Sequence, residues 1–562
     1  MVSTSIVGKK EKTRGGSGII STDMKAALLT TLAFICSFVL IIPPDWHVGD
    51  DSTIAMVLNG LGWTDEPSEY VPFINIYLCK IIKWFSEHWP QWFWYSFFIF
   101  ALTAISLFQI LLMVFDQKRP TSFLVTVLGL VFFVYFPLFV SISFTKTAIF
   151  LGVSSLFILL HLQNQQDSSH TKFKEIFGVL GFVLASLLRF NGAMLALTLC
   201  APWLVYSLIK KPSVTKKLSL AISLGCLTAL TGIFHFLHFK SYAQSPDWAN
   251  YMSSAKILSY FMDYYRDFTS SEMIEKLATV GIDNLDVKLI RHWLISEDIL
   301  SDSKLLKLKD LIPPPKMTLF EGAWAVLRWN FLKQATLILL SVSLGMFFVC
   351  KKRRECLLMW SGAFVVAVYL KVYMKLPARL FEPLLGTMLL SPLVFWSSPP
   401  IQWMNRKWVT GLLFVIMLKV NVSEARYVRY LARELYQTKT TYLQDLFQLN
   451  QATKDIIYWI YNDFTELPVF RSPKPHLKSF RLLGFGWFGR TGLQKERMRE
   501  LGVDSVFKGL LDGRNAVVVA TPEVHPLLQE VFKRKYDEVG VEFEPVFNGA
   551  YLKAFRVVKS RF

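Results

Sequence analysis

The feature that most constrains this chain is a series of long apolar runs that charged residues rarely interrupt. An α-helix needs about 20 apolar residues to cross the ~30 Å hydrocarbon core of a membrane. Runs of about that length recur along the first three quarters of the sequence, and 53% of all residues are hydrophobic. We therefore predict an all-α polytopic membrane protein and exclude a water-soluble fold. The predicted transmembrane helices are about eleven in number: 24–44, 92–115, 121–141, 146–162, 175–189, 192–209, 218–239, 334–350, 356–374, 379–396 and 407–421.

The placement of charge predicts the orientation of these spans. The chain carries a formal net charge of +19, and lysine and arginine gather in short links such as 210–217 and 351–354. Basic links of this kind face the cytoplasm and meet anionic membrane lipids, so no nucleic-acid partner is needed to explain the charge. We expect the N-terminus inside and the C-terminal region outside. The pair 175–189 and 192–209 leaves an alternative, one bent helix plus a re-entrant segment, which would invert everything downstream.

Three regions follow from this orientation. Residues 1–23 form a cytoplasmic tail, 24–421 form a transmembrane module, and 422–562 form an extracytoplasmic C-terminal domain. The module carries two long outer loops, 45–91 and 240–333. The C-terminal domain mixes helical and strand-like patterns, which predicts a small α/β domain.

The first outer loop opens with two adjacent carboxylates, Asp50 and Asp51, shortly after the first span. Adjacent like charges and partial burial raise the pKa of a carboxyl group, which makes it a usable general base near neutral pH. The alternative is structural, because an aspartate before residues 52–58 could cap a short surface helix. Both interpretations stay open at this point, and one aspartate could cap while the other reacts.

Three cations interrupt or border apolar runs at predicted outer ends of spans: Lys146, Arg189 and Arg379. Ionisable side chains at such depth are costly and usually paired, and the planar guanidinium of arginine matches a phosphate. We predict that these three residues bind a lipid phosphate, and snorkelling of each side chain to the headgroups is the alternative. Asn75 and Asn191 are the candidate substrate-binding residues.

Motifs for metals and nucleotides are weak in this sequence. The six cysteines show no CxxC spacing, and His235 and His238 share a helix face without a third ligand nearby in the sequence. We predict no metal site from these residues, although a divalent cation such as Mg²⁺ could bridge Asp50 or Asp51 and a phosphate. Residues 484–489 match GxGxxG, but we interpret them as a glycine-rich turn of the C-terminal domain rather than a dinucleotide site.

The aspartate pair, the outer arginines and the C-terminal outer domain together resemble the type C glycosyltransferase (GT-C) superfamily, whose members use sugars carried on polyprenyl phosphate or pyrophosphate. The narrower resemblance is to a group of bacterial polytopic proteins mostly without assigned substrate. The run that carries it is Asp50, Asp51, Met56, Gly60, Pro67, Phe73, Asn75, Trp94 and Tyr95. Shorter matches extend it over about the first 400 residues: 144–148, 188–190, 248–263, 286–301 and 377–379. The resemblance implies a bacterial inner (cytoplasmic) membrane protein in which Asp50 or Asp51 is the base.

These observations predict a membrane glycosyltransferase that moves a sugar from a polyprenyl-phosphate-linked donor to an extracytoplasmic glycan or lipid acceptor of the cell envelope. Asp50 or Asp51 would deprotonate the acceptor hydroxyl, while Lys146, Arg189 and Arg379 would stabilise the charge on the leaving phosphate. A flippase or transporter of lipid-linked glycans would instead spread charges through the depth of the membrane. A polymerase or ligase of such glycans would place its key residues in the later outer loop. A non-enzymatic receptor or assembly protein would tolerate alanine at both aspartates.

Overall fold

The structure is a computed structural model that describes most of the chain between Thr22 and Lys559. The described residues are 22–42, 44–115, 121–163, 171–210, 213–262, 271–292, 294–297, 300–308, 311, 317–330, 343–344, 347, 353–374, 376–395, 407–453, 456–460, 467–477, 480–512, 516–520, 524–538 and 540–559. The predicted span 334–350 and the predicted tail 1–23 lie almost wholly outside them.

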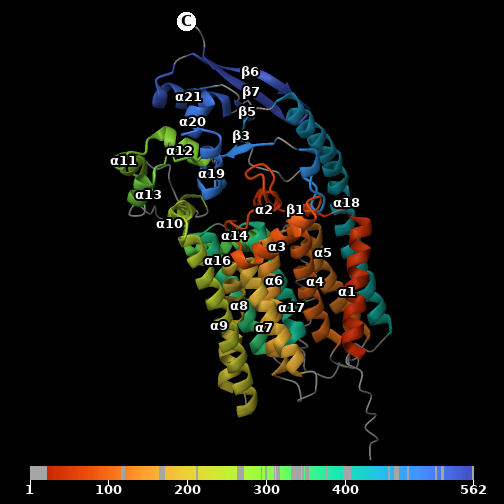
Figure 1. The fold of residues 1–562 in the computed structure, drawn as a ribbon. Helices are drawn as coiled ribbons and strands as arrows, with labels where there is room; N and C mark the ends of the chain where they lie inside the picture. Colours follow the sequence, from red (N-terminus) through yellow and green to blue (C-terminus); the bar gives the residue numbers. More distant parts are fainter. Residues whose placement is uncertain are drawn as a thin grey trace, which may run out of the picture.

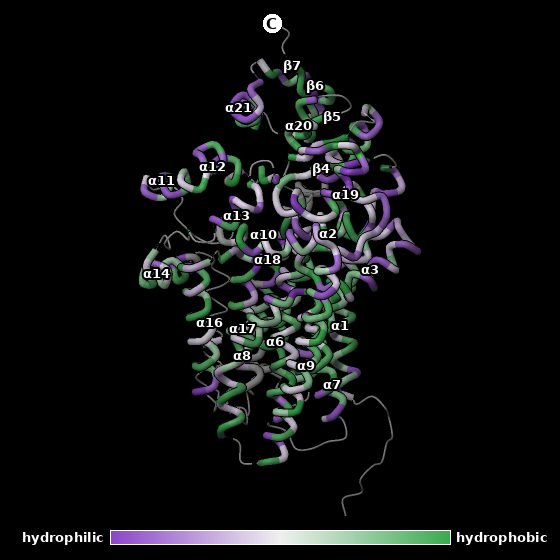
Figure 2. Tube along the Cα trace, turned by 60° about the vertical axis from the view of Figure 1, so that its left-hand side comes forward, coloured by the Kyte–Doolittle hydropathy of each residue, from purple (hydrophilic) through white to green (hydrophobic). Residues whose placement is uncertain are grey.

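A bundle of long helices forms the lower part of the molecule in Figure 1, and Figure 2 shows that hydrophobic residues dominate it. Ten of the predicted spans coincide with its helices: α1 (Thr22–Ile41), α4 (Trp94–Phe115), α5 (Thr121–Val140), α6 (Phe144–Leu162), α7 (Thr171–Leu188), α8 (Phe190–Lys210), α9 (Val214–Ala243), α16 (Arg353–Tyr373), α17 (Ala378–Phe395) and the start of α18 (Lys407–Ala452). Among the described residues, the helices α4, α6, α8, α9 and α16 are long and apolar enough to cross a membrane by length and composition alone. The predicted polytopic α-helical fold class is thus confirmed.

α6 lies at the centre of the bundle, and all of its residues are buried. The helices α4, α7, α8 and α17 pack around it. Small residues allow the close approach, since a Cβ added to Gly152 would lie 2.8 Å from the Ala196 side chain. Ser154 donates a hydrogen bond to Gln109 of α4 at 2.6 Å, and Ser155 donates to the same oxygen at 3.1 Å. Membrane helices associate through small residues and interhelical hydrogen bonds of this kind.

α7 and α8 are two antiparallel helices, although only Arg189 separates them. Along α7, Gly178 lies against Ile158 and Gly181 against Ser155, so α7 runs towards the N-terminus of α6. Gly192 at the start of α8 lies against Ala148, so α8 runs away from it again. The alternative of one bent helix plus a re-entrant segment is therefore wrong, and Arg189 is placed at the turn.

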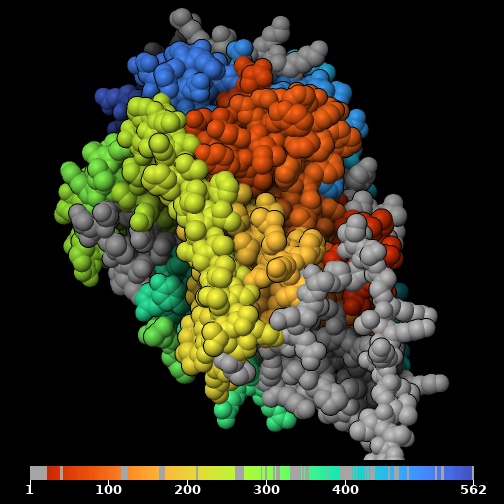
Figure 3. All heavy atoms as spheres, turned by 60° about the horizontal axis from the view of Figure 1, so that its bottom comes forward, coloured from red at the N-terminus to blue at the C-terminus, as the bar shows by residue number. Residues whose placement is uncertain are grey.

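Both predicted outer loops lie at the end of the bundle that carries the C-terminal domain, which we call the domain end (Figure 1). Their elements are β1 (Asp45–Trp46), α2 (Gly49–Asn59), α3 (Ile76–His88), α10 (Pro246–Met262), α11 (Ser271–Thr279), α12 (Asn284–Arg291), α13 (Asp302–Leu308) and α14 (Leu319–Asn330). In Figure 3, α9 (yellow) lies beside the orange N-terminal segment that includes α3. The Asn75 side chain donates to the Phe234 carbonyl of α9 at 3.0 Å, which fixes this contact.

The C-terminal domain contains a five-stranded sheet in the order β4-β3-β5-β7-β6. Its three parallel strands and its antiparallel hairpin are β3 (Ile456–Trp459), β4 (Leu482–Gly484), β5 (Ala516–Val519), β6 (Val541–Asn548) and β7 (Lys553–Lys559). The accompanying helices are α19 (Gly492–Glu500), α20 (Val506–Leu511) and α21 (His525–Tyr536), with 3₁₀ turns η2 (Lys474–His476) and η3 (Phe488–Arg490). This is the small α/β domain that the sequence predicts.

α18 joins the bundle to this domain without a break. It runs from Lys407 to Ala452, so the predicted domain boundary after residue 421 falls inside a continuous helix. Near its C-terminal end, Asp445 accepts hydrogen bonds from the backbone N–H groups of Tyr551 at 2.6 Å and Leu552 at 3.0 Å. The helix therefore also caps the turn between β6 and β7.

Buried arginines fasten the C-terminal domain to both outer loops. Arg497 of α19 is 3% exposed and binds the Asp65 carboxylate at 2.8 Å. Arg490 of η3 is 2% exposed and binds Asp302 of α13 at 2.6 Å. Trp46 adds a hydrogen bond from its indole N–H to the Leu467 carbonyl at 2.9 Å. Each of these two ion pairs joins a buried guanidinium of the C-terminal domain to an exposed carboxylate of one loop.

Candidate active site

A short parallel strand pair places the first outer loop against the start of α6. β1 pairs with β2 (Ser141–Ile142), and the backbone N–H of His47 donates to the Ile142 carbonyl at 3.0 Å. α2 begins directly afterwards, with Asp50 and Asp51 in its first turn. Its N-cap is Val48, which makes no side-chain cap, so neither aspartate caps α2. The capping interpretation is wrong for this helix.

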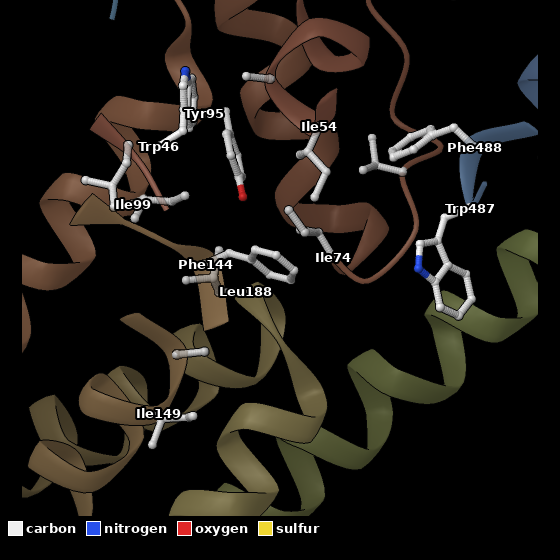
Figure 4. Packing of buried hydrophobic residues seen from close by; sticks show 14 of the residues in the cluster. Trp46, Ile54, Ile74, Tyr95, Ile99, Phe144, Ile149, Leu188, Trp487 and Phe488 are labelled. Atoms are coloured by element: carbon white, nitrogen blue, oxygen red, sulfur yellow. The ribbon is translucent and has the colours of Figure 1, made fainter. Parts of the chain in front are cut away.

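Asp51 is completely buried and is held by two donors from other elements. Its Oδ1 accepts a hydrogen bond from the Tyr95 hydroxyl at 2.8 Å and from the Phe144 backbone N–H at 2.9 Å. Figure 4 shows the Tyr95 hydroxyl pointing towards the segment that carries Phe144. Asp51 therefore caps α6 in place of α2. Its Oδ2 has no hydrogen-bond partner among the described residues.

Burial raises the pKa of Asp51 to about 7, against the lowering effect of the Phe144 and Tyr95 hydrogen bonds. An aspartate in the unfolded chain has a pKa of about 3.8. The folded protein therefore binds one more proton than the unfolded chain between about pH 4 and pH 7, and its stability falls as the pH rises through that window. The effect amounts to at most about 4 kcal/mol.

We expect Asp51→Asn to remove this contribution, because asparagine keeps the Oδ1 acceptor and does not titrate. The measurement is the melting temperature of the detergent-solubilised protein at pH 5 and pH 8. Wild type should lose more stability between the two values than Asp51→Asn does. Glu544→Gln, at an exposed position of β6, is the control and should follow wild type. Equal losses in wild type and Asp51→Asn would contradict the assignment.

Asp50 differs from its neighbour because its carboxylate is partly exposed. Its side chain is 29% exposed, and its Oδ2 lies 3.1 Å from a guanidinium nitrogen of Arg379, at the start of α17. One turn along α17, Glu382 lies 2.6 Å from the Nζ of Lys146, whose side chain is 1% exposed. α17 thus supplies a partner to each of two predicted site residues. The sequence interpretation missed Glu382, although its spacing of three residues from Arg379 places both on one helix face.

Arg189 reaches the same region from the turn between α7 and α8. Its guanidinium donates to the Thr145 hydroxyl at 2.8 Å and lies 4.5 Å from the ring centroid of Phe144 and 5.6 Å from that of Phe73. Phe73 has a φ of 78°, a conformation that residues other than glycine rarely adopt. Such strained residues gather at functional sites. The N-terminal turn of α6 is therefore the point where Asp51, Arg189 and Lys146 meet.

His47 is a neutral member of this cluster. Burial, followed by the positive charges of Lys146 and Arg379, lowers the pKa of His47 to about 3. Its Nδ1 forms a hydrogen bond with the Ser141 hydroxyl at 2.7 Å. The imidazole is thus uncharged at neutral pH and adds a polar group without adding a fourth cation.

The two candidate asparagines occupy different environments. Asn75 is buried and caps α3 by accepting from the Tyr77 N–H at 3.1 Å, while its own N–H donates to the Leu187 carbonyl at 2.9 Å. Asn75 thus joins the start of α3 to the end of α7, close in sequence to Arg189. Asn191 is exposed at the start of α8. A substrate contact at either residue stays a prediction.

The fold has counterparts among solved structures. No model of a known protein family matches the sequence, and no curated protein matches it. ArnT from Cupriavidus metallidurans in the apo state is similar over 94% of this chain and 98% of that chain, with 10% identity and a TM-score of 0.50. ArnT from the same organism bound to undecaprenyl phosphate is similar over 94% and 97%, with 11% identity and a TM-score of 0.48. This chain has the same fold as ArnT.

The fold shared with ArnT extends well beyond the part of the sequence that carries the resemblance. The short motifs cover about the first 400 residues, whereas the structural match covers 94% of the chain and so includes most of the C-terminal domain. The domain that motifs alone leave unmatched is thus part of the shared architecture.

The aspartate pair is a poor magnesium site. The Arg379 guanidinium already pairs with the Asp50 carboxylate. The Asp51 carboxylate is buried against Tyr95 and the Phe144 amide. Among the described residues, no group of three or more His, Cys, Asp or Glu side chains could hold a metal ion.

Proposed function

We propose that the protein is a membrane glycosyltransferase that moves a sugar from a polyprenyl-phosphate-linked donor to an extracytoplasmic glycan or lipid acceptor. The observation that carries the proposal is the Asp50–Arg379 pair at the domain end of an apolar bundle. A carboxylate at this end of the bundle lies on the side where we place the extracytoplasmic acceptor. A guanidinium beside it suits the phosphate of a lipid donor. Arg189 adds positive charge at the same helix turn, where Lys146 forms an ion pair with Glu382.

The structure supports different roles for the two aspartates. Asp50 is partly exposed and can reach a substrate, so we assign it as the base that takes the proton from the acceptor hydroxyl. Asp51 is fully buried and binds Tyr95 and the start of α6, so we assign it as a positioning residue. It fixes the turn of α2 that carries Asp50.

The reaction that follows is a single transfer. The acceptor oxygen loses its proton to Asp50 and forms a bond with the anomeric carbon of the sugar. The bond between that carbon and the phosphate oxygen breaks, and polyprenyl phosphate leaves with the bonding electrons. Arg379 and Arg189 stabilise the negative charge that develops on the leaving phosphate, which is where a preorganised cation has its largest effect.

Specific contacts disfavour the rival interpretations. A polymerase or ligase would use residues of the 240–333 segment, but Asp286 pairs with Lys535 and Asp302 with Arg490, both in the C-terminal domain. These carboxylates hold the domain in place. A transporter would need ionisable groups along the depth of the bundle, whereas the described cations of the cluster gather at the domain end.

The test compares the surface glycans and envelope lipids of cells that carry wild type, Asp50→Ala, Arg189→Ala or Glu544→Gln in place of the chromosomal copy. We expect loss of one sugar in Asp50→Ala and a decrease of about tenfold or more in Arg189→Ala, since each removes a charged contact to the reacting groups. Glu544→Gln should match wild type. An unchanged composition in every variant, at wild-type expression, would overturn the proposal.

A further inference from the structure

A polar pocket of about 400 Å³ lies between the later outer loop and the C-terminal domain. Its walls come from α10, from the segment around Glu297, and from α19 with the turn that follows it. The charged side chains that line it are Asp247, Glu297, Lys495, Arg499 and Asp504. This volume is in the range of pockets that hold small ligands.

The charges of the pocket alternate in sign. Lys495 lies 2.6 Å from Glu297 and 3.9 Å from Asp247, and Arg499 lies 2.6 Å from Asp247. With Asp504, three carboxylates face two cations. A surface of this kind offers both donors and acceptors of charge-assisted hydrogen bonds, and its slight negative excess disfavours a polyanion. Hydroxyl groups, which both donate and accept, suit it best.

A chain of contacts links the pocket to the candidate active site. Gly489 lines the pocket, and two residues earlier Trp487 packs its ring edge-on against Phe73 at 5.7 Å. Figure 4 shows Trp487 and Phe488 beside the segment that carries Ile74. Phe73 in turn lies under the Arg189 guanidinium.

Glycine at position 489 is required for this close packing. A Cβ there would lie 2.8 Å from the Gly484 carbonyl oxygen and 3.2 Å from that of Ile295. The glycine-rich run 484–489 thus contains both a residue that lines the pocket and a residue that contacts Phe73. The close packing of Gly489 explains the GxGxxG match at residues 484–489 without nucleotide binding.

We infer that this pocket binds the acceptor as an uncharged oligosaccharide, a specificity that rests on the proposed function. Its hydroxyls bind Glu297, Asp247 and Lys495, while the reacting end of the glycan extends past Trp487 towards Asp50. The acceptor is therefore a neutral glycan rather than a phosphorylated or uronic-acid polymer.

The test uses the full chain in nanodiscs of phosphatidylcholine and measures saturation-transfer NMR signals from soluble probes. The probes are the neutral maltotetraose, cellotetraose and chitotetraose, and the anionic tetragalacturonic acid. We expect signals from at least one neutral probe and much weaker signals from the anionic one. No neutral binding, or a preference for the anionic probe, would overturn the inference.

A pocket variant with a matched control locates the binding. Gly502 lines the pocket with a φ of 65°, which asparagine tolerates, and a Cβ there meets no atom within 4 Å. Gly502→Asn should reduce the neutral-probe signal by about tenfold by occupying the pocket. Gly281→Asn, at an exposed turn with a φ of 78° and its nearest neighbour at 3.8 Å, should leave the signal unchanged. Equal signals in both variants would place the binding elsewhere.

Donor hydrolysis separates this inference from the proposed function. If wild type transfers a sugar to a neutral glycan, Gly502→Asn loses that transfer and Gly281→Asn keeps it, both proposals hold. If no variant or wild type cleaves a polyprenyl-phosphate sugar while neutral probes still bind the pocket, the proposed function fails and the pocket assignment stands.

Discussion

Asp50→Asn is expected to lower the rate of sugar transfer by about two to four orders of magnitude, the range that a positioned general base contributes. Asparagine keeps the shape of the side chain and an oxygen that can accept from Arg379, but it cannot take the acceptor proton. The measurement is the initial rate of polyprenyl phosphate release in proteoliposomes at saturating donor. The affinity for the donor should change little, because the carboxylate acts on the acceptor.

Asp51→Asn is the matched control for this result, since the two residues are adjacent in α2. Its amide keeps the Tyr95 and Phe144 contacts, so we expect a rate within about tenfold of wild type. A larger loss in Asp51→Asn than in Asp50→Asn would reverse the roles assigned to the two aspartates. A comparison of the melting temperatures of wild type and both variants excludes misfolding as the cause of a lost activity.

Arg379→Ala is expected to lower kcat/KM for the donor by about two to three orders of magnitude, because it removes a preorganised charge from the leaving phosphate. KM for the donor should rise as well, since the guanidinium also binds the phosphate before reaction. Arg379→Lys should recover part of the loss: it restores the charge but not the planar fork that binds two oxygens.

The split between the kinetic constants identifies what Arg379 does. If it only positions Asp50, with which it pairs at 3.1 Å, kcat falls and the donor KM stays at its wild-type value. That outcome would contradict a phosphate contact. Arg328→Ala removes an exposed arginine in the last turn of α14 and should leave both constants unchanged.

The helices of the bundle could be predicted from the sequence because their signal is local. A run of about 20 apolar residues has few stable alternatives to a membrane helix, since every backbone polar group must be satisfied within the segment. The boundary of the C-terminal domain could not be predicted in the same way. The apolar part of α18 stops near residue 421, but its hydrogen-bonded backbone continues to Ala452 with a more polar surface.

The candidate site could be predicted as residue types but not as pairs. Asp50 and Arg379 are 329 positions apart, and only the packing of α17 on α6 brings them together. Glu382 carried a usable signal in its spacing from Arg379. The approach of Trp487 to Phe73 had no local signal, because it depends on how the C-terminal domain docks on the first outer loop.

α18 is one continuous helix that connects the bundle to the C-terminal domain. A helix rises about 1.5 Å and turns about 100° with each residue, so one residue inserted near the middle of α18 would lift and rotate everything beyond it. The Lys439 side chain, which pairs with Asp45 of β1, would then point away from the loop that carries the aspartates. The length of this helix therefore fixes the height and the rotation of the C-terminal domain relative to the bundle.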